Sequence, residues 1–278
     1  MKLTVLVDNN TLIDRYFYGE PGVSYYIEAD GVKVLFDLGY SDLFIRNANK
    51  MSIDLLDLDY IVLSHGHLDH TWGLDPLLRL YAEAGLEGLP AKRPELVAHP
   101  NALLPKWNDE IPQSGSLIVA NKLPSFFELS LDKTPQRLSE NLILLGEIER
   151  SNNFEAQKPH GKTLENGIAG DDYLLDDSAL VYMTEKGLVI ITGCSHSGIC
   201  NIVEQARDLT GEQRVLDIIG GFHLMDPAPE QLQGTVEYLQ ALNPGELHAC
   251  HCTDLNSKIA LAKVANLKEV GVGLTLEY

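Results

Sequence analysis

The 278-residue sequence is 45% hydrophobic and 22% charged, a balance that supplies enough apolar material for a sizeable core and excludes wholesale disorder. Its 21 Lys and Arg residues against 40 Asp and Glu residues give a net charge of −19, which repels nucleic-acid phosphates and anionic lipid headgroups. We therefore expect a small-molecule substrate, and neither a nucleic-acid nor a membrane partner.

The apolar runs and the cysteines indicate the compartment. No apolar run approaches the roughly 18 residues that span a bilayer, and the N-terminal run meets a charge at Asp8, too early for a secretory leader. The four cysteines are too few for a disulfide scaffold and lack zinc-knuckle spacing. The sequence thus predicts a cytoplasmic protein with reduced thiols.

Short β-branched runs alternate with helical patterns along the chain, which is typical of an α/β fold. The predicted strands are Leu3–Val7, Ser24–Glu28, Val32–Phe36, Tyr60–Leu63, Glu95–Ala98, Asn141–Leu145, Ser178–Thr184, Gly187–Thr192, Val215–Ile219, Glu246–Cys250 and Gly273–Glu277. The predicted helices are Ser41–Lys50, Gly73–Ala84, Ser197–Leu209, Pro229–Leu242 and Leu255–Ala265. Hairpin-like strands run into strand–helix units twice, so we expect a four-layer αβ/βα sandwich.

We expect residues 1–278 to form a single domain. Within it, residues 85–139 are richer in Pro and polar residues and poorer in periodicity than the rest. Insertions of this kind often shape a substrate cleft. We therefore interpret this stretch as a cleft-covering insertion.

The segment from Ile61 to Leu74 holds four metal-competent side chains within six residues: His65, His67, Asp69 and His70. His65 and His67 can point the same way because side-chain direction repeats every two residues in an extended chain. Asp69 and His70 then fall on the following bend. In a chain with only nine His residues, this grouping is improbable by chance, and it predicts a metal site.

Four further candidate residues each follow an apolar run: Asp37, His196, His223 and His251. Ligands of open α/β sheets bind at the carboxyl ends of the strands, so these side chains should converge with the first group on one edge. One tetrahedral zinc needs only three protein ligands plus water. The larger set therefore predicts two metal ions.

Two divalent ions roughly 3.5–4 Å apart can hold a hydroxide nucleophile and polarise the oxygen of the bond that it attacks. The expected reaction is therefore hydrolysis. Ligation by many imidazoles and few thiolates suits zinc, while iron or manganese remains open.

The order of Asp37, His65-x-His67-x-Asp69-His70, His196 and His251 resembles the metallo-β-lactamase fold superfamily over nearly the whole chain. Four motifs carry a closer resemblance: Leu63-Ser64-His65-Gly66-His67, Thr192-Gly193-Cys194-Ser195-His196-Ser197-Gly198-Ile199, Gly220-Gly221-Phe222-His223-Leu224 and Cys250-His251-Cys252-Thr253. In detail they are similar to the branch of metal-dependent hydrolases of β-lactamase superfamily II, some members of which carry the name of a dihydropterin-linked aminobenzene phosphate synthase.

The resemblance implies a role for each matching residue. It assigns His65, His67 and His196 to a first metal and Asp69, His70 and His251 to a second. Asp37 would orient the loop and its metal ligands without binding the metal itself. The superfamily usually supplies a bridging Asp after the strand that follows His196, and here that strand ends in Gly220-Gly221-Phe222-His223. Either His223 lies near the metals or no side chain bridges them. The branch also favours an early His-Gly-Leu-Ser run, where this chain has Pro21-Gly22-Val23-Ser24.

We take Asp69 and His223 as candidate catalytic residues. His223 can alternatively be a ligand, a donor to a developing oxyanion or a structural histidine. The remaining polar candidates have simpler interpretations. We take Cys194 as a small buried hydrophobe rather than a thiolate ligand or redox-sensitive thiol, His160 as part of a solvated loop rather than a contact to an anionic substrate, and Asp176-Asp177 as a solvated acidic pair.

The predicted function is a metal-dependent hydrolase in which a metal-bound hydroxide attacks an ester-like bond of a small, phosphorylated or pterin-like substrate. The alternative is a non-catalytic metal-containing binding or redox-sensing protein, which would hold metal without turnover.

Overall fold

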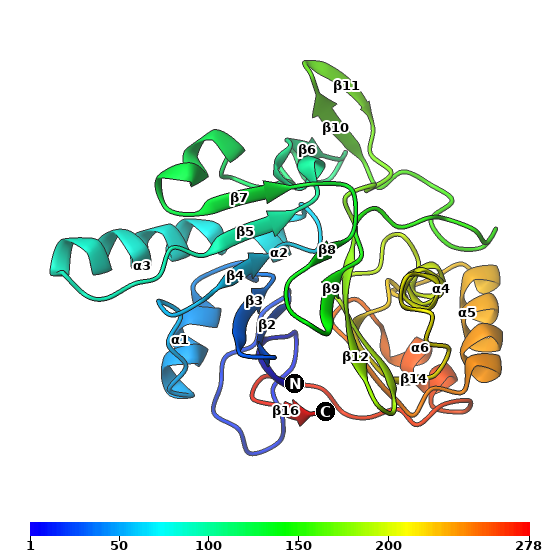
Figure 1. The fold of residues 1–278 in the computed structure, drawn as a ribbon. Coiled ribbons are helices and arrows are strands. Elements are labelled where there is room, and N and C mark those ends of the chain that lie inside the picture. The colour runs from blue at the N-terminus through cyan, green and yellow to red at the C-terminus, as the bar shows by residue number, and fades with distance from the viewer.

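Two β-sheets face each other in the middle of the molecule, and helices cover their outer surfaces (Figure 1). The computed structural model describes residues 1–278. The first sheet has the order β16-β1-β2-β3-β4-β5-β7. Its strands are β1 (Lys2–Val7), β2 (Ser24–Ala29), β3 (Val32–Phe36), β4 (Tyr60–Val62), β5 (Glu95–Ala98), β7 (Glu128–Leu131) and β16 (Thr275–Glu277).

The second sheet has the order β15-β14-β13-β12-β9-β8. Its strands are β8 (Gln136–Arg137), β9 (Leu142–Leu144), β12 (Ala179–Thr184), β13 (Gly187–Thr192), β14 (Val215–Gly221) and β15 (Glu246–Cys250). The α-helices are α1 (Leu43–Lys50), α2 (Leu68–Thr71), α3 (Leu74–Glu87), α4 (Ile199–Thr210), α5 (Pro229–Leu242) and α6 (Leu255–Leu261), and the 3-10 helices are η1 (Pro100–Leu103) and η2 (Ala120–Ser125).

Three apolar clusters separate the layers. Alternate residues of a strand face opposite sides of its sheet, so Phe36 of β3 joins a central cluster with Ile191 of β13, while Leu35 packs with Leu77 of α3 in a second cluster. A third cluster joins the other face of β12–β15 to α4 and α5. The predicted four-layer αβ/βα arrangement is confirmed.

The predicted strands and helices are all present, with ends that shift by a few residues. The one-turn helix α2 was missed: it carries Asp69 and His70, where the sequence suggested a bend. Five short strands were also missed, namely β6 (Lys106–Trp107), β7, β8, β10 (Lys162–Glu165) and β11 (Ile168–Asp171). None of the helices combines the length and the apolar character that crossing a membrane requires.

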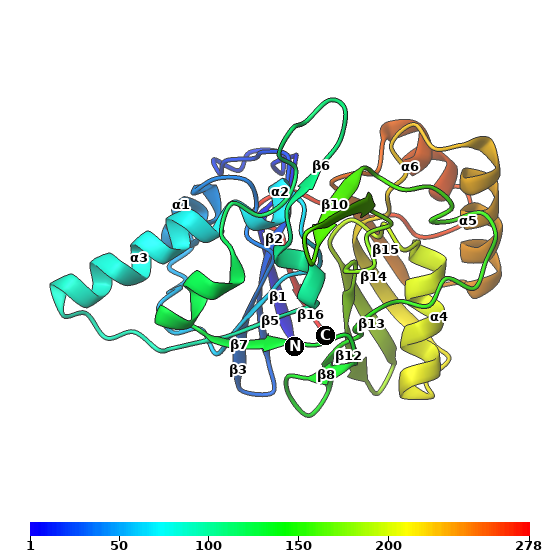
Figure 2. The same cartoon turned by 90° about the horizontal axis from the view of Figure 1, so that it is seen from above.

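Residues 85–139 contribute strands to three sheets. β5 and β7 extend the first sheet in parallel, and β8 forms the edge of the second sheet beside β9. β6 pairs with β10 in a separate three-stranded sheet with β11. Figure 1 shows the β10–β11 hairpin projecting from the body, and the view from above places β6 and β10 beside the space where the two large sheets meet (Figure 2). Two distant segments therefore jointly border that end of the molecule.

The parallel strands β3 and β4 in one sheet, and β13, β14 and β15 in the other, carry the candidate residues at their carboxyl ends. Asp37, Ser195, His223 and His251 follow four of these strands and have φ between 50° and 60°. This left-handed conformation is unfavourable for residues with side chains and tends to persist at functional sites. The chain therefore turns sharply at each strand end.

Candidate metal centre

Three imidazoles form the first group of the site. The ring centroids of His65, His67 and His196 lie 4.7–4.8 Å apart. Ser64 Oγ donates to Asp37, so His65 Nδ1 donates to Ser64 Oγ at 2.9 Å and its Nε2 keeps a lone pair. That Nε2 and both ring nitrogens of His196 are buried without a partner. Since buried polar atoms normally have partners, these nitrogens are suited to bind a cation.

Burial keeps this first group uncharged. Burial lowers the pKa of His65 and of His196 well below the usual value, and it lowers the pKa of His67 to about 4. Metal ligands must be deprotonated, so the imidazoles are in the state that a cation requires.

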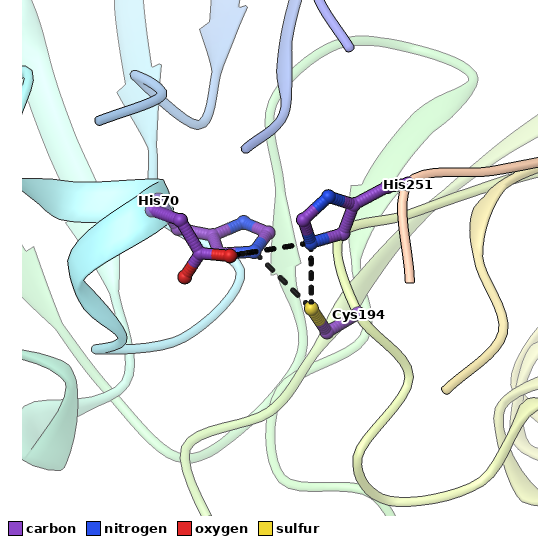
Figure 3. Close-up of side chains that lie close together, drawn as sticks. His70, Cys194 and His251 are labelled. Carbon is purple, nitrogen blue, oxygen red and sulfur yellow. Dashed lines mark hydrogen bonds and ion pairs between the residues drawn. The ribbon is translucent and has the colours of Figure 1, made fainter. Parts of the chain in front are cut away.

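The second group joins four residues from three strand ends. His251 Nε2 lies 3.4 Å from Asp69 Oδ2 and 3.1 Å from Cys194 Sγ, and His70 Nε2 lies 3.2 Å from the same sulfur. Figure 3 shows the rings of His70, from α2, and of His251, which follows β15, both directed toward Cys194. An imidazole pair, a carboxylate and a thiol thus converge on one point.

Hydrogen bonds behind the rings fix their orientation. Asp37 Oδ1 accepts from Ser64 N (2.7 Å) and its Oδ2 accepts from His70 Nδ1 (2.6 Å). His251 Nδ1 donates to Asn9 Oδ1 (2.9 Å), and Asp8 Oδ1 accepts from His251 N (3.0 Å). Metal-binding histidines typically donate the second ring N–H to such a partner. Each Nε2 consequently faces the centre as the ligand atom.

The charges of the second group favour a cation. Burial opposes protonation of His70, but Asp37 and Asp69 outweigh it and raise its pKa to about 9. Burial likewise opposes ionisation of Asp69, but His70 and His251 bring the pKa of Asp69 below its usual value. The centre therefore attracts positive charge, and a bound metal ion would take the place of this proton. Both donor sets fit divalent metal ions, and the division between two ions stays a prediction.

His223 and His160 lie beside the first group. The His223 ring is 4.2 Å from that of His196, and the His160 ring lies 4.8 Å from His196 and 4.7 Å from His223. A cavity of about 500 Å³ opens here. It is lined by Pro21, Tyr40, His67, Leu68, Asp69, Asn108, Ile111, Ser114, His160, His196 and His223. His223 thus belongs to the cavity wall, next to the candidate ligands.

Two interpretations of polar residues were wrong. His160 is half-buried in the cavity wall rather than solvated, and Asp176 and Asp177 are buried, not solvated. Cys194 is buried as expected, and its sulfur also contacts two imidazoles. The only sequence signal for Cys194 was its position two residues before His196, on the same turn.

The acidic pair anchors two site loops. Asp176 accepts from Gly66 N at 2.8 Å, between two candidate ligands, and pairs with Lys106 Nζ at 3.0 Å. Asp177 Oδ2 accepts from Ser197 N at 2.9 Å, beside His196. The partners are separated by long stretches of chain, so no local pattern could have revealed them.

Two other histidines lie outside the group. His99 accepts from Asn101 N at the start of η1 and contacts Glu147 at 3.2 Å. His248 Nδ1 pairs with Asp217, with oxygens at 2.8 and 2.9 Å. Both are structural in this arrangement.

Comparison with known sequences gives one family and two relatives from one organism. The sequence model of the metallo-beta-lactamase superfamily matches residues 18–117. The 7,8-dihydropterin-6-methyl-4-(beta-D-ribofuranosyl)-aminobenzene-5'-phosphate synthase of Methanocaldococcus jannaschii is 32% identical over 273 residues, covering 93% of this chain and 89% of that protein. An uncharacterized protein of the same organism is 27% identical and covers 98% of both chains.

Two solved structures share the fold of this chain. The crystal structure of a metal-dependent hydrolase of the beta-lactamase superfamily matches with a TM-score of 0.83 and 29% identity, covering 100% of this chain and 99% of that one. A diphosphatase from the PhnP family shares the fold at a TM-score of 0.55 and 18% identity, covering 100% and 97% of the two chains.

Proposed function

Because this chain belongs to the metallo-β-lactamase superfamily, we propose that it is a metal-dependent hydrolase with two divalent ions, acting on an ester-like bond of a small, phosphorylated or pterin-like substrate. The observation that carries this proposal is the set of buried, unpartnered imidazole nitrogens beside a cavity of about 500 Å³. Bound divalent ions would lower the pKa of a water molecule bound to them and would polarise an oxygen of the substrate.

The residues around the cavity would have different roles. His65, His67 and His196 would hold one ion, and Asp69, His70 and His251 the other. Asp69 also lines the cavity, so its carboxylate can accept a proton from a group arriving there. Asp37 and Asn9 keep His70 and His251 in their orientations.

The cavity wall suits an anionic substrate with a flat ring. Its volume is that of a small-molecule site. His160 and His223 can donate hydrogen bonds to a phosphoryl or acyl oxygen on which charge develops. The Tyr40 ring, which stacks on Trp72 at a centroid distance of 5.0 Å, is partly exposed beside the cavity and offers a face for a pterin-like ring.

A second candidate is a synthase reaction that forms a dihydropterin-containing, phosphorylated product. It is favoured by the name of the relative that is 32% identical. The two candidates differ in their products: a hydrolase releases two fragments of one substrate, whereas a synthase joins two substrates.

The test is turnover with and without metal. We expect the protein, loaded in turn with zinc, manganese and iron, to hydrolyse bis(p-nitrophenyl) phosphate or a generic lactone. Chelation should abolish this activity, and adding the metal back should restore it. Bound metal without turnover on phosphodiesters, phosphomonoesters, lactones or thioesters would contradict the hydrolase proposal and favour a metal-binding or redox-sensing protein.

A further inference from the structure

The end of β14 has no room for a side chain that could bridge two ions. β14 ends in Gly220 and Gly221. A Cβ on Gly221 would lie 2.6 Å from Cys252 Sγ and 2.7 Å from Gly193 O, and one on Gly220 would collide with Thr192 O. A carboxylate cannot enter the centre from this strand, so a shared ligand has to come from elsewhere.

The Cys194 sulfur occupies the position that such a ligand needs. Sγ lies 3.2 Å from His70 Nε2 and 3.1 Å from His251 Nε2. Ligand atoms of His65 and His196 also form a group with this sulfur, all within 4.8 Å of one another. Cys194 is the one residue common to both groups, and Figure 3 shows it between the rings of the second group.

The distances agree with metal ligation. Zinc lies about 2.0–2.1 Å from imidazole nitrogen and about 2.3 Å from sulfur, so a tetrahedral site separates the two ligand atoms by roughly 3.5 Å. The sulfur-to-nitrogen separations are shorter than this by a few tenths of an ångström. In the group that Cys194 forms with His65 and His196, the His65 Nε2 and both ring nitrogens of His196 are buried without a partner.

The backbone around Cys194 holds the sulfur in place. Ser195 has φ 60°, and its Oγ donates to Gly221 O at 2.6 Å. Gly193 lets the turn approach the first sheet, because a Cβ there would collide with Ser64 Oγ. The sulfur position is thus set by contacts to both sheets rather than by free rotation of a loop.

We propose that Cys194 is a metal ligand whose sulfur is shared between the two ion positions, replacing a bridging carboxylate. This inference rests on the proposed metal centre but not on hydrolysis. Thiolate is a strong ligand for zinc, cobalt and iron. The two ions would then be joined through sulfur, which sets this centre apart from one built only of imidazoles and carboxylates.

The test is the absorption spectrum of the cobalt(II)-loaded protein, because cobalt bound to thiolate shows a sulfur-to-metal charge-transfer band in the near ultraviolet. We expect this band in wild type and in Cys200→Ser, whose thiol is buried in α4 and belongs to neither group of candidate ligands. It should be absent from Cys194→Ser, which should also bind cobalt at least 10-fold more weakly. Cys194→Asp should recover cobalt binding without the band, because a carboxylate can ligate in place of sulfur.

A measurement on wild type keeps the proposal testable if Cys194→Ser does not fold. X-ray absorption of zinc-loaded wild type should show a sulfur neighbour at about 2.3 Å from the metal, and Cys200→Ser, Cys250→Ser and Cys252→Ser should each keep it, which leaves Cys194 as its source. A band that survives in folded Cys194→Ser, a band lost only in Cys252→Ser, or a zinc shell without sulfur in wild type would overturn the proposal. Each of these results leaves the turnover test unaffected.

Discussion

Replacing His67 with Ala should reduce turnover by more than about 100-fold. Loss of a residue that only supports a ligand typically costs 10–100-fold in affinity or activity, and we place His67 in contact with the metal itself. Its ring lies 4.8 Å from His65 and 4.7 Å from His196, and it lines the cavity. Its loss should therefore affect both metal binding and the geometry facing the substrate. Steady-state kinetics on whichever ester class the wild type hydrolyses will measure the effect.

His99→Asn provides the matched control for His67→Ala. His99 is buried outside the metal centre, where its side chain accepts from Asn101 N at the start of a helix. Asn also serves well at this capping position, so the variant should keep metal content and turnover. Turnover that survives in His67→Ala would contradict the hydrolase proposal, because the proposed chemistry depends on this ligand.

Replacing Lys106 with Met should lower the free energy of unfolding by about 3–5 kcal/mol, the usual cost of removing one partner of a buried ion pair. Lys106 is buried, and its Nζ donates to Asp172 (2.8 Å) and to Asp176 (3.0 Å), which are both buried as well. Without the ammonium, two carboxylates remain in a dry environment. Urea unfolding of the full chain under identical metal conditions measures the difference.

Lys162→Met is the control, because Lys162 pairs with Asp171 at 3.0 Å on the projecting hairpin with both side chains 55% exposed. Exposed pairs contribute about 0–1 kcal/mol, so this variant should remain close to wild type. If Lys106→Met had the same free energy of unfolding as Lys162→Met, the buried ion pairs of Lys106 would not stabilise the fold. Asp176 also accepts from Gly66 N, so we expect Lys106→Met to weaken metal binding, whereas Lys162→Met should not.

Much of the candidate site could be predicted because its residues follow apolar strands. Each of five candidate residues lies within four residues of the end of a buried strand, and parallel strands bring their carboxyl ends to one edge. These residues are Asp37, His65, His196, His223 and His251. The layers could be predicted for a similar reason, since alternating and helical apolar patterns are local signals.

The contacts that could not be predicted involve partners far away in the sequence. Cys194 lies 124 residues from His70, and a buried cysteine is ordinarily a small hydrophobe. His160 enters the cavity wall because β10 pairs with β6, with Lys162 opposite Trp107, and two-residue pairings carry almost no pattern. Asp176 looked solvated because its cation, Lys106, lies 70 residues earlier.

The number of metal ions bound per chain tests the account most directly. Elemental analysis of wild type after equilibrium dialysis against zinc should give two ions per chain, while Asp69→Asn should give close to one, because Asp69 lies 3.4 Å from His251 Nε2 in the second group. A wild type that binds no metal would contradict the central claim that these imidazoles and carboxylates form a metal centre. Equal loss of both ions from Asp69→Asn would contradict the division of the ligands between them.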